Sequence, residues 1–212
     1  MNNEYIVTGI TRLDNKYQLV CFNYNYSLKL YNSEIRKYSI EVEGLLDEES
    51  FEIIKKSVTK RCLNRALNLL KSRDYTVHKL DEKLTLGNYP RDIIDSVIER
   101  LLNEKFLDDY RYASNYITGR IGKASKKKII LDLSNKGIDK AVISKAYEDS
   151  QDFQNENFEL IAAKEALVKK VKGNYECAYE DRMKYFAYLG RKGFSFEVIK
   201  KAWDELADET LD

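Results

Sequence analysis

LSNKGIDKAVISKA (residues 133–146) is the stretch that decides the fold, because the chain repeats its pattern twice more. The matching stretches are LTLGNYPRDIIDSV (84–97) and LGRKGFSFEVIKKA (189–202), and the three align without a gap. Each starts with leucine, has Gly or Asn four residues later and a bulky apolar residue next, and continues with Ile and then Val or Ala at helical spacing. Such self-similarity indicates a repeat architecture.

Each of these stretches predicts the end of one helix, a turn and a second amphipathic helix. Gly or Asn after a last helical turn suits the left-handed conformation, and an apolar residue then closes the turn. We therefore expect Gly137 and Gly193 to have positive φ. Residue types that commonly cap helices stand eight residues before each leucine and ahead of each second helix. The expected caps are Thr76, Ser125 and Asp181 for the first helices, and Asp139 and Ser195 for the second, with Pro90 beginning the second helix of the first copy.

A further helix is expected ahead of each copy, in Cys62–Leu70, Tyr112–Ile121 and Phe158–Val171. Three-helix units of this size bury little surface alone, so neighbours must stack. We expect a mostly α fold, about two-thirds helical, with three tandem three-helix repeats in an elongated array. The expected segments are 1–54 for an N-terminal region and 55–106, 107–152 and 153–212 for the repeats, the last ending in an acidic tail. The alternative is one irregular helical bundle in which the similarity arose by chance.

Residues 4–31 differ from the rest of the chain in their periodicity. EYIVTGI, YQLVCFN and YSLKLY are short and rich in Tyr, Val, Ile and Phe, with turn-forming residues between them. They predict a small antiparallel sheet confined to residues 4–31, followed by a short helix near Ser33–Tyr38. Three short strands are not very stable alone, so we expect this sheet to lean on the helices.

Composition is that of a foldable protein of the cytoplasm. Hydrophobic residues make up 43% and charged residues 33%, and a single proline favours long helices. No apolar run approaches the roughly 20 residues that span a bilayer, and residues 1–20 lack a signal-peptide pattern. The widely spaced Cys21, Cys62 and Cys177 suggest neither a disulfide framework nor a zinc site. We expect a cytoplasmic monomer that does not bind membranes.

The residues of a catalytic site are not apparent. His78 is the only histidine, which excludes a two-histidine metal site, and no phosphate-binding glycine motif follows a strand. We therefore expect no enzyme activity, no cofactor and no bound metal. Most of the sixteen tyrosines occupy strand or helix-core positions, where packing explains them, and stacking on nucleic acid is the alternative.

Charge is strongly segregated although the net charge is only +1. Residues 41–52 carry six acids and no base, and we expect a solvated acidic loop there. Residues 55–73 carry seven bases and no acid, and residues 120–128 form a second acid-free cluster. Such runs are either solvated faces or surfaces that meet phosphate or an acidic protein groove. The candidate partner-binding and DNA-binding residues are Lys60, Arg61, Arg65, Arg73, Arg111, Arg120, Lys123, Lys126, Lys127 and Lys128.

Three successive lysines, Lys126–Lys128, open a predicted helix directly after its Ser125 cap. Three successive side chains spread around a helix, so at least two of them must meet solvent. Positive charge at a helix N-terminus also opposes the helix dipole. This placement is better explained by binding of the lysines to an anionic partner than by a contribution of the lysines to folding stability.

Several stretches in the right order resemble the RecX family of RecA regulators. The resemblance covers roughly residues 60–204, and its most telling pieces are Ser72-Arg73-Asp74 and FLDDYRYA (106–113). The N-terminal strands and GLLDEESFEII (44–54) resemble the leader of RecX proteins from low-GC Gram-positive bacteria. The longer matching stretches are ALNLLKSRDYTVHKLDEKL (66–84), NYPRDIIDSVIERLLNEKFLDDYRYASNYI (88–117), KGIDKAVISKAYED (136–149) and RKGFSFEVIKKAW (191–203).

The resemblance implies a non-catalytic regulator that binds the RecA–DNA filament along its helical groove. It implies restraint of recombination, DNA repair and the SOS response, with weak binding to single- and double-stranded DNA. The chain departs from the family pattern at Asn88, where Gly is usual, and has Lys, Asn and Tyr at several places where Arg, Glu and Ala are usual. Arg and Lys are not equivalent at bidentate phosphate contacts, so affinity for filament or DNA is in doubt there.

Two other functions fit the same pattern. Two capped helices joined by a short turn are typical of helix-turn-helix DNA-binding regulators. However, the second helix of each copy is not especially basic, and no dimerisation zipper is evident. A helical-repeat scaffold that binds only proteins is the third interpretation.

Overall fold

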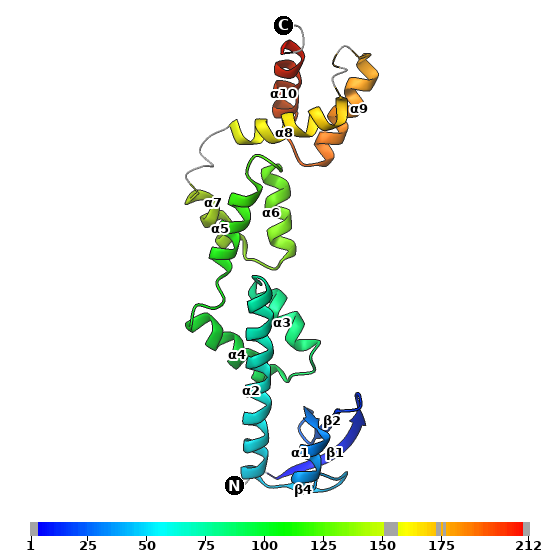
Figure 1. Ribbon diagram of the computed structural model, residues 1–212, viewed down its shortest axis with the longest axis vertical. Helices are drawn as coiled ribbons and strands as arrows, with labels where there is room; N and C mark the ends of the chain where they lie inside the picture. The colour runs from blue at the N-terminus through cyan, green and yellow to red at the C-terminus, as the bar shows by residue number, and fades with distance from the viewer. Residues whose placement is uncertain (1–3, 151–156, 173–174, 176, 210–212) are drawn as a thin grey trace. The chain divides into compact units, whose positions relative to one another are not determined.

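The computed structural model describes residues 4–150, 157–172, 175 and 177–209 (Figure 1). It divides into two compact units, Met1–Asp108 and Asp109–Asp212, which are described separately. The described residues form ten helices and one four-stranded sheet. This confirms the mostly helical fold with a small N-terminal antiparallel sheet. Among the described residues, no helix is both long and apolar enough to cross a lipid bilayer.

The sheet of the first unit has the strand order β3-β2-β1-β4, with antiparallel neighbours. Val20 lies opposite Ile10 on one side and Leu28 on the other. The prediction that the sheet ends at residue 31 is wrong, because Leu45 and Leu46 add an edge strand. Two residues are too few to show an alternating pattern in the sequence. The strands are β1 (Tyr5–Arg12), β2 (Tyr17–Phe22), β3 (Tyr26–Tyr31) and β4 (Leu45–Leu46).

The long helix α2 (Glu48–Ser72) accounts for much of the charge segregation. The Asp47 carboxylate accepts a hydrogen bond from the Ser50 N–H at 2.8 Å and caps this helix. The acidic loop expected over residues 41–52 is therefore wrong for its second half. Acids in the first turn and Lys71 in the last turn are both favourable in the field of the helix dipole.

The sheet and the first repeat share one hydrophobic core. The Tyr5 ring stacks on Phe51 of α2 at 3.5 Å, and Leu28 and Leu30 of β3 are fully buried. The boundary expected between residues 54 and 55 falls inside α2, so no break separates the N-terminal region from the first repeat. The other helices of this unit are α1 (Asn32–Lys37), which confirms the short helix expected near Ser33–Tyr38, α3 (Val77–Thr85) and α4 (Arg91–Asn103).

The second unit contains the two later repeats, each with its own core. Ile117, Ile129 and Leu133 are buried in the earlier core, and Leu167 and Trp203 in the later one. The boundary expected between residues 152 and 153 lies outside the described residues, as does Asp212 of the acidic tail. The helices are α5 (Asp109–Arg120), α6 (Lys126–Asn135), α7 (Lys140–Glu148), α8 (Asn157–Val171), α9 (Tyr179–Arg191) and α10 (Phe196–Asp208).

The turn at the centre of each repeat has the expected geometry. Gly137 and Gly193 have φ of 78° and 94°, and Asn88 takes the same left-handed conformation at 59°. In the later copies, the N–H of the apolar residue donates to the leucine carbonyl, which explains the fixed five-residue spacing. The three repeat leucines, Leu84, Leu133 and Leu189, are fully buried.

The helix caps follow the prediction with one exception. Thr76, Ser125, Asp139 and Ser195 each accept a hydrogen bond from a backbone N–H in the first turn of their helix. Asp181 does not cap α9, because that helix begins two residues earlier, after Ala178. Its carboxylate lies in the first turn, where negative charge is favourable beside the positive end of the helix dipole.

Candidate functional site

Nine of the ten candidate residues fall into two groups, one in each unit, and the tenth is Arg111. The α2 group consists of Lys60, Arg61 and Arg65 on α2 with Arg73 just beyond its end. The α5–α6 group consists of Arg120, Lys123 and Lys126–Lys128, where α5 ends and α6 begins, and exposed Arg111 lies in the first turn of α5.

Arg61 is the member of the α2 group whose guanidinium forms a shielded ion pair within the protein. Its guanidinium lies 2.6 Å from the Glu34 carboxylate and donates to the Lys29 carbonyl at 3.1 Å. It also donates to Ser57 and lies 5.0 Å from the centre of the Tyr31 ring. The ion pair is mostly shielded, with 18% and 17% of the two side chains exposed. Arg61 therefore ties α1 and β3 to α2.

The other three members of the α2 group are exposed. In the part of the chain that the structure describes, Lys60, Arg65 and Arg73 form no ion pair with a carboxylate. The Arg73 guanidinium lies 4.7 Å from the centre of the Tyr75 ring. Arg65 lines a pocket, and the sequence did not predict this pocket.

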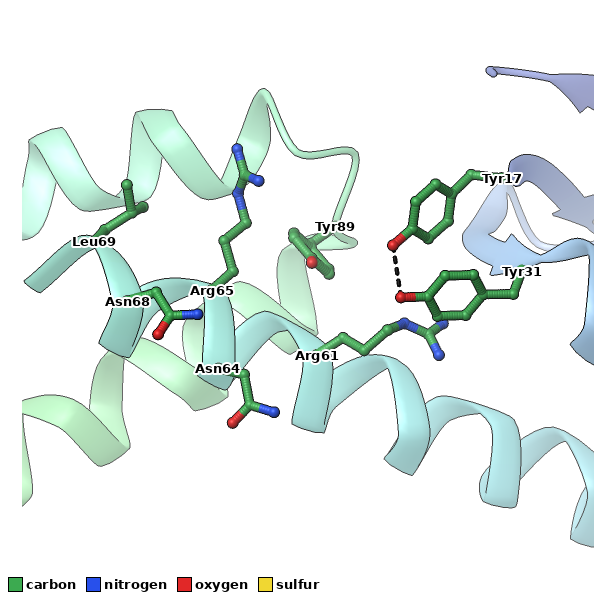
Figure 2. A pocket seen from close by; sticks show the side chains of 8 residues that line it. All are labelled: Tyr17, Tyr31, Arg61, Asn64, Arg65, Asn68, Leu69 and Tyr89. Atoms are coloured by element: carbon green, nitrogen blue, oxygen red, sulfur yellow. Dashed lines mark hydrogen bonds between the residues drawn. The ribbon is translucent and has the colours of Figure 1, made fainter. Parts of the chain in front are cut away.

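The pocket has a volume of about 500 Å³ and lies between the strand ends and the polar face of α2 (Figure 2). The Tyr17 hydroxyl donates to the Tyr31 hydroxyl at 2.7 Å, and this bond and burial raise the pKa of Tyr17 to about 12. Burial also raises the pKa of Tyr89. The phenols of Tyr17 and Tyr89 are therefore neutral at physiological pH. The lining residues are Tyr17, Tyr31, Arg61, Asn64, Arg65, Asn68, Leu69 and Tyr89.

Ser125 fixes the start of α6 and with it the α5–α6 group. Its buried hydroxyl accepts from the Lys128 N–H at 3.2 Å and donates to the Lys192 carbonyl at 2.7 Å. The hydroxyl thus joins the N-terminus of α6 to the C-terminus of α9. The three lysines that follow it are all exposed, as the sequence predicts for at least two of them.

These lysines also have neighbours within the unit. The Lys128 ammonium lies 2.7 Å from Asp132. Burial opposes ionisation of Asp132, but hydrogen bonds from Lys128 and Tyr116 outweigh it and lower its pKa. The Lys126 N–H donates to Glu159 at 3.3 Å, and its ammonium lies 5.4 Å from the centre of the Tyr147 ring. Ion pairs this exposed contribute little stability.

Aromatic rings accompany the cations of the α5–α6 group. The Arg120 guanidinium lies 5.4 Å from the centre of the Tyr116 ring, and Lys136 lies 5.6 Å from the same ring and 5.7 Å from Tyr112. The Lys123 ammonium donates to the Gly119 carbonyl at 3.3 Å. Lys136 was not predicted, because it lies outside the basic run and joins this surface only through helix packing.

The single histidine and the buried cysteine of the first unit have ordinary surroundings. His78 is exposed and lies 3.0 Å from Glu82, its neighbour one turn later on α3. Within the described ranges, no group of three or more His, Cys, Asp or Glu side chains could hold a metal ion. Burial raises the pKa of the Cys62 thiol to about 12, so it is not a reactive thiolate.

Comparisons with known proteins agree with the repeat boundaries seen in the fold. Models described as the first, second and third three-helix domains of RecX match residues 62–101, 108–146 and 159–203. The regulatory protein RecX of Finegoldia magna is 35% identical over 182 residues, which cover 82% of this chain and 86% of that protein. The regulatory protein RecX of Vibrio vulnificus is 35% identical and covers 70% of this chain and 92% of that protein.

Two solved structures share the fold. A crystal structure of RecX from Lactobacillus salivarius superposes with a TM-score of 0.60 at 25% identity, and covers 70% of this chain and 96% of that chain. A crystal structure of regulatory protein RecX has a TM-score of 0.63 at 19% identity, and covers 94% of this chain and 99% of that chain.

Proposed function

The chain belongs to the RecX family of regulatory proteins, and we propose that it binds the RecA–DNA filament along its groove. Bound there, it restrains recombinase activity, homologous recombination, DNA repair and the SOS response. The role is regulatory, and the relatives are named as regulatory proteins rather than as enzymes. We further propose that the chain acts in the cytoplasm as a monomer and binds free single- and double-stranded DNA weakly.

The α5–α6 group is the observation that carries this proposal. Lys126, Lys127 and Lys128 form the first turn of α6, where cations oppose the helix dipole. By contrast, α2 and α9 have acids in their first turns. All three lysines are exposed, so the core does not require them. An anionic partner, such as DNA phosphate or an acidic protein surface, accounts for this placement.

The aromatic rings beside these cations suit the same partner. Tyr112 and Tyr116 lie one turn apart on α5, with their rings nearly parallel at 12° and centroids 6.4 Å apart. Lys136 and Arg120 lie over them. A surface that combines cations with rings can contact both phosphates and bases.

The proposal is tested by the ATPase activity of RecA on single-stranded DNA, with and without this protein. We expect the ATPase rate to fall as the protein is added, because a protein bound in the groove shortens the filament or blocks its growth. An unchanged rate, together with no co-sedimentation with RecA–DNA filaments, would contradict the proposal.

Helix-turn-helix recognition of duplex DNA is the alternative, and the first repeat offers it little support. Arg91, at the start of α4, pairs with Asp81 and Asp95, and Arg100 lies 2.7 Å from Glu104. Both arginines of this second helix thus have carboxylate neighbours on the surface of the first unit. A gel shift on one duplex sequence but not on others, without RecA, would favour this alternative.

A further inference from the structure

The pocket between the sheet and α2 carries an inference that rests on the DNA binding proposed above but not on the binding of RecA. Its walls all belong to the first unit, whose sheet and first repeat share one core. Tyr17 and Tyr31 come from β2 and β3, and Arg61, Asn64, Arg65 and Asn68 form a polar stripe on α2 (Figure 2). Their spacing of three or four residues places them on one side of the helix.

The charge of the pocket favours an anion. Two arginines line it and no carboxylate does. The Arg61 charge is compensated by Glu34, whereas Arg65 forms no ion pair within the described part of the chain. Arg65 thus offers a planar guanidinium with five N–H donors, a shape that matches phosphate oxygens in pairs.

The rings of the pocket favour a planar group next to that anion. Tyr17 and Tyr31 lie 4.4 Å apart, and their mutual hydrogen bond leaves one hydroxyl hydrogen for a ligand. Tyr89 occupies the repeat position held by Ile138 and Phe194, which are buried, yet Tyr89 is only partly buried and lines the pocket. A Cβ at Gly87 would lie 2.9 Å from the Tyr89 ring, so glycine there permits this ring position.

Asn64 and Asn68 supply the hydrogen-bond donors and acceptors of the pocket. Both side chains are exposed, and neither has a hydrogen-bond partner among the described residues. A carboxamide both donates and accepts, which is the pattern that reads the edge of a nucleobase. A volume of about 500 Å³ is within the range of small-molecule sites.

We propose that this pocket binds one nucleotide, either a unit of single-stranded DNA or a free mononucleotide. Arg65 contacts the phosphate, the Tyr89 ring stacks on the base, the Tyr17–Tyr31 pair forms the wall beside it, and the amides of Asn64 and Asn68 bind its edge. The N-terminal sheet then has a role, since Tyr17 and Tyr31 form one wall of the site.

The test is fluorescence anisotropy of a labelled oligothymidylate with the full chain, in the absence of RecA. We expect Arg65→Ala to weaken binding at least tenfold, and Asn68→Trp, which fills the pocket without changing charge, to weaken it similarly. Arg65→Lys should restore only part of the affinity, because an ammonium cannot bind phosphate as a planar fork. Lys56→Ala is the matched control, since it removes one exposed cation of α2 outside the pocket.

Competition identifies the source of the nucleotide. Displacement of the labelled strand by thymidine monophosphate at a similar concentration of nucleotides indicates a free mononucleotide, and displacement by unlabelled strand alone indicates single-stranded DNA. Equal losses for Arg65→Ala and Lys56→Ala, with no effect of Asn68→Trp, would overturn the proposal. Displacement by a polyglutamate peptide as effective as displacement by either nucleotide source would overturn it as well, because the pocket would then select only negative charge. Thermal melts of each variant test whether its fold is intact.

Discussion

On α2, the guanidinium of Arg61 is mostly shielded in its ion pair with Glu34, whereas Lys126, Lys127 and Lys128 at the start of α6 are exposed, and the Lys128 ion pair with Asp132 is exposed as well. The two regions also differ in their relation to the helix dipole. On α2 acids lead and bases follow, which favours folding, while on α6 the bases lead. A basic residue that stabilises the fold, such as Arg61, does not require an external partner to explain it. The α6 lysines oppose the helix dipole, so they are better evidence of an external anionic partner.

Arg61→Ala should have the largest effect on stability. It leaves the Glu34 carboxylate poorly exposed and without its main cation, and it removes a donor to the Lys29 carbonyl. We expect a loss of about 2–4 kcal/mol in the free energy of unfolding, measured by urea denaturation. Lys60→Ala, one residue away and exposed, should change it by less than about 0.5 kcal/mol. Equal effects of the two variants would remove the distinction between internal and external bases.

Gly193→Val should rank next, because it acts on the support of the α6 lysines. Its φ of 94° is unfavourable for valine, and a Cβ there would lie 2.7 Å from Ser125 Oγ, which two hydrogen bonds hold in place. We expect a loss of about 2–3 kcal/mol, against about 1–2 kcal/mol for Gly137→Val, where strain at φ of 78° acts. If both variants melt like the wild type, the left-handed turn is not needed.

Ser125→Ala should cost somewhat less, about 1–2 kcal/mol, since it removes a helix cap and a donor to the Lys192 carbonyl. Asp139→Ala, in the same unit, is the comparison for a cap alone. Asp139 caps α7 through the Ala141 N–H, and we expect about 1 kcal/mol there. A larger loss for Asp139→Ala than for Ser125→Ala would contradict a special anchoring of α6.

Much of the fold could be predicted because the repeat signal is local. The buried leucines, the positive φ of Gly137 and Gly193 and four of the five helix caps depend on residues within about one turn of each other. β4 was missed because two residues carry no periodicity, and the acidic loop was wrong because α2 starts before its apolar pattern becomes regular.

The sequence predicted the candidate site only as runs of basic residues, without the contacts that each of them makes. Nothing in the sequence distinguishes Arg61 from Arg65, because Glu34 and the Lys29 carbonyl reach Arg61 only through tertiary packing. The pocket was hidden for the same reason. Tyr89 fits the repeat as an apolar residue, and its position beside Tyr17 and Tyr31 depends on how the sheet packs on α2.

Reversal of the three α6 lysines should affect stability least. The triple variant Lys126→Glu/Lys127→Glu/Lys128→Glu gains favourable charge at the helix N-terminus, but places glutamates beside Glu159 and Asp132. These effects oppose each other, so we expect a net change within about 1 kcal/mol. Lys200→Glu/Lys201→Glu, which reverses two exposed lysines of α10, is the control for charge reversal elsewhere in the unit.

A salt titration of binding to the RecA–DNA filament, comparing wild type with the triple variant, tests the central claim most directly. The account predicts much weaker binding by the triple variant, mainly through slower association, and a shallower dependence of affinity on salt, because steering and counterion release are lost. The α10 control should keep both the affinity and the slope of the wild type. Matching affinities and matching slopes for the wild type and the triple variant would contradict the assignment of the α6 lysines to an anionic partner.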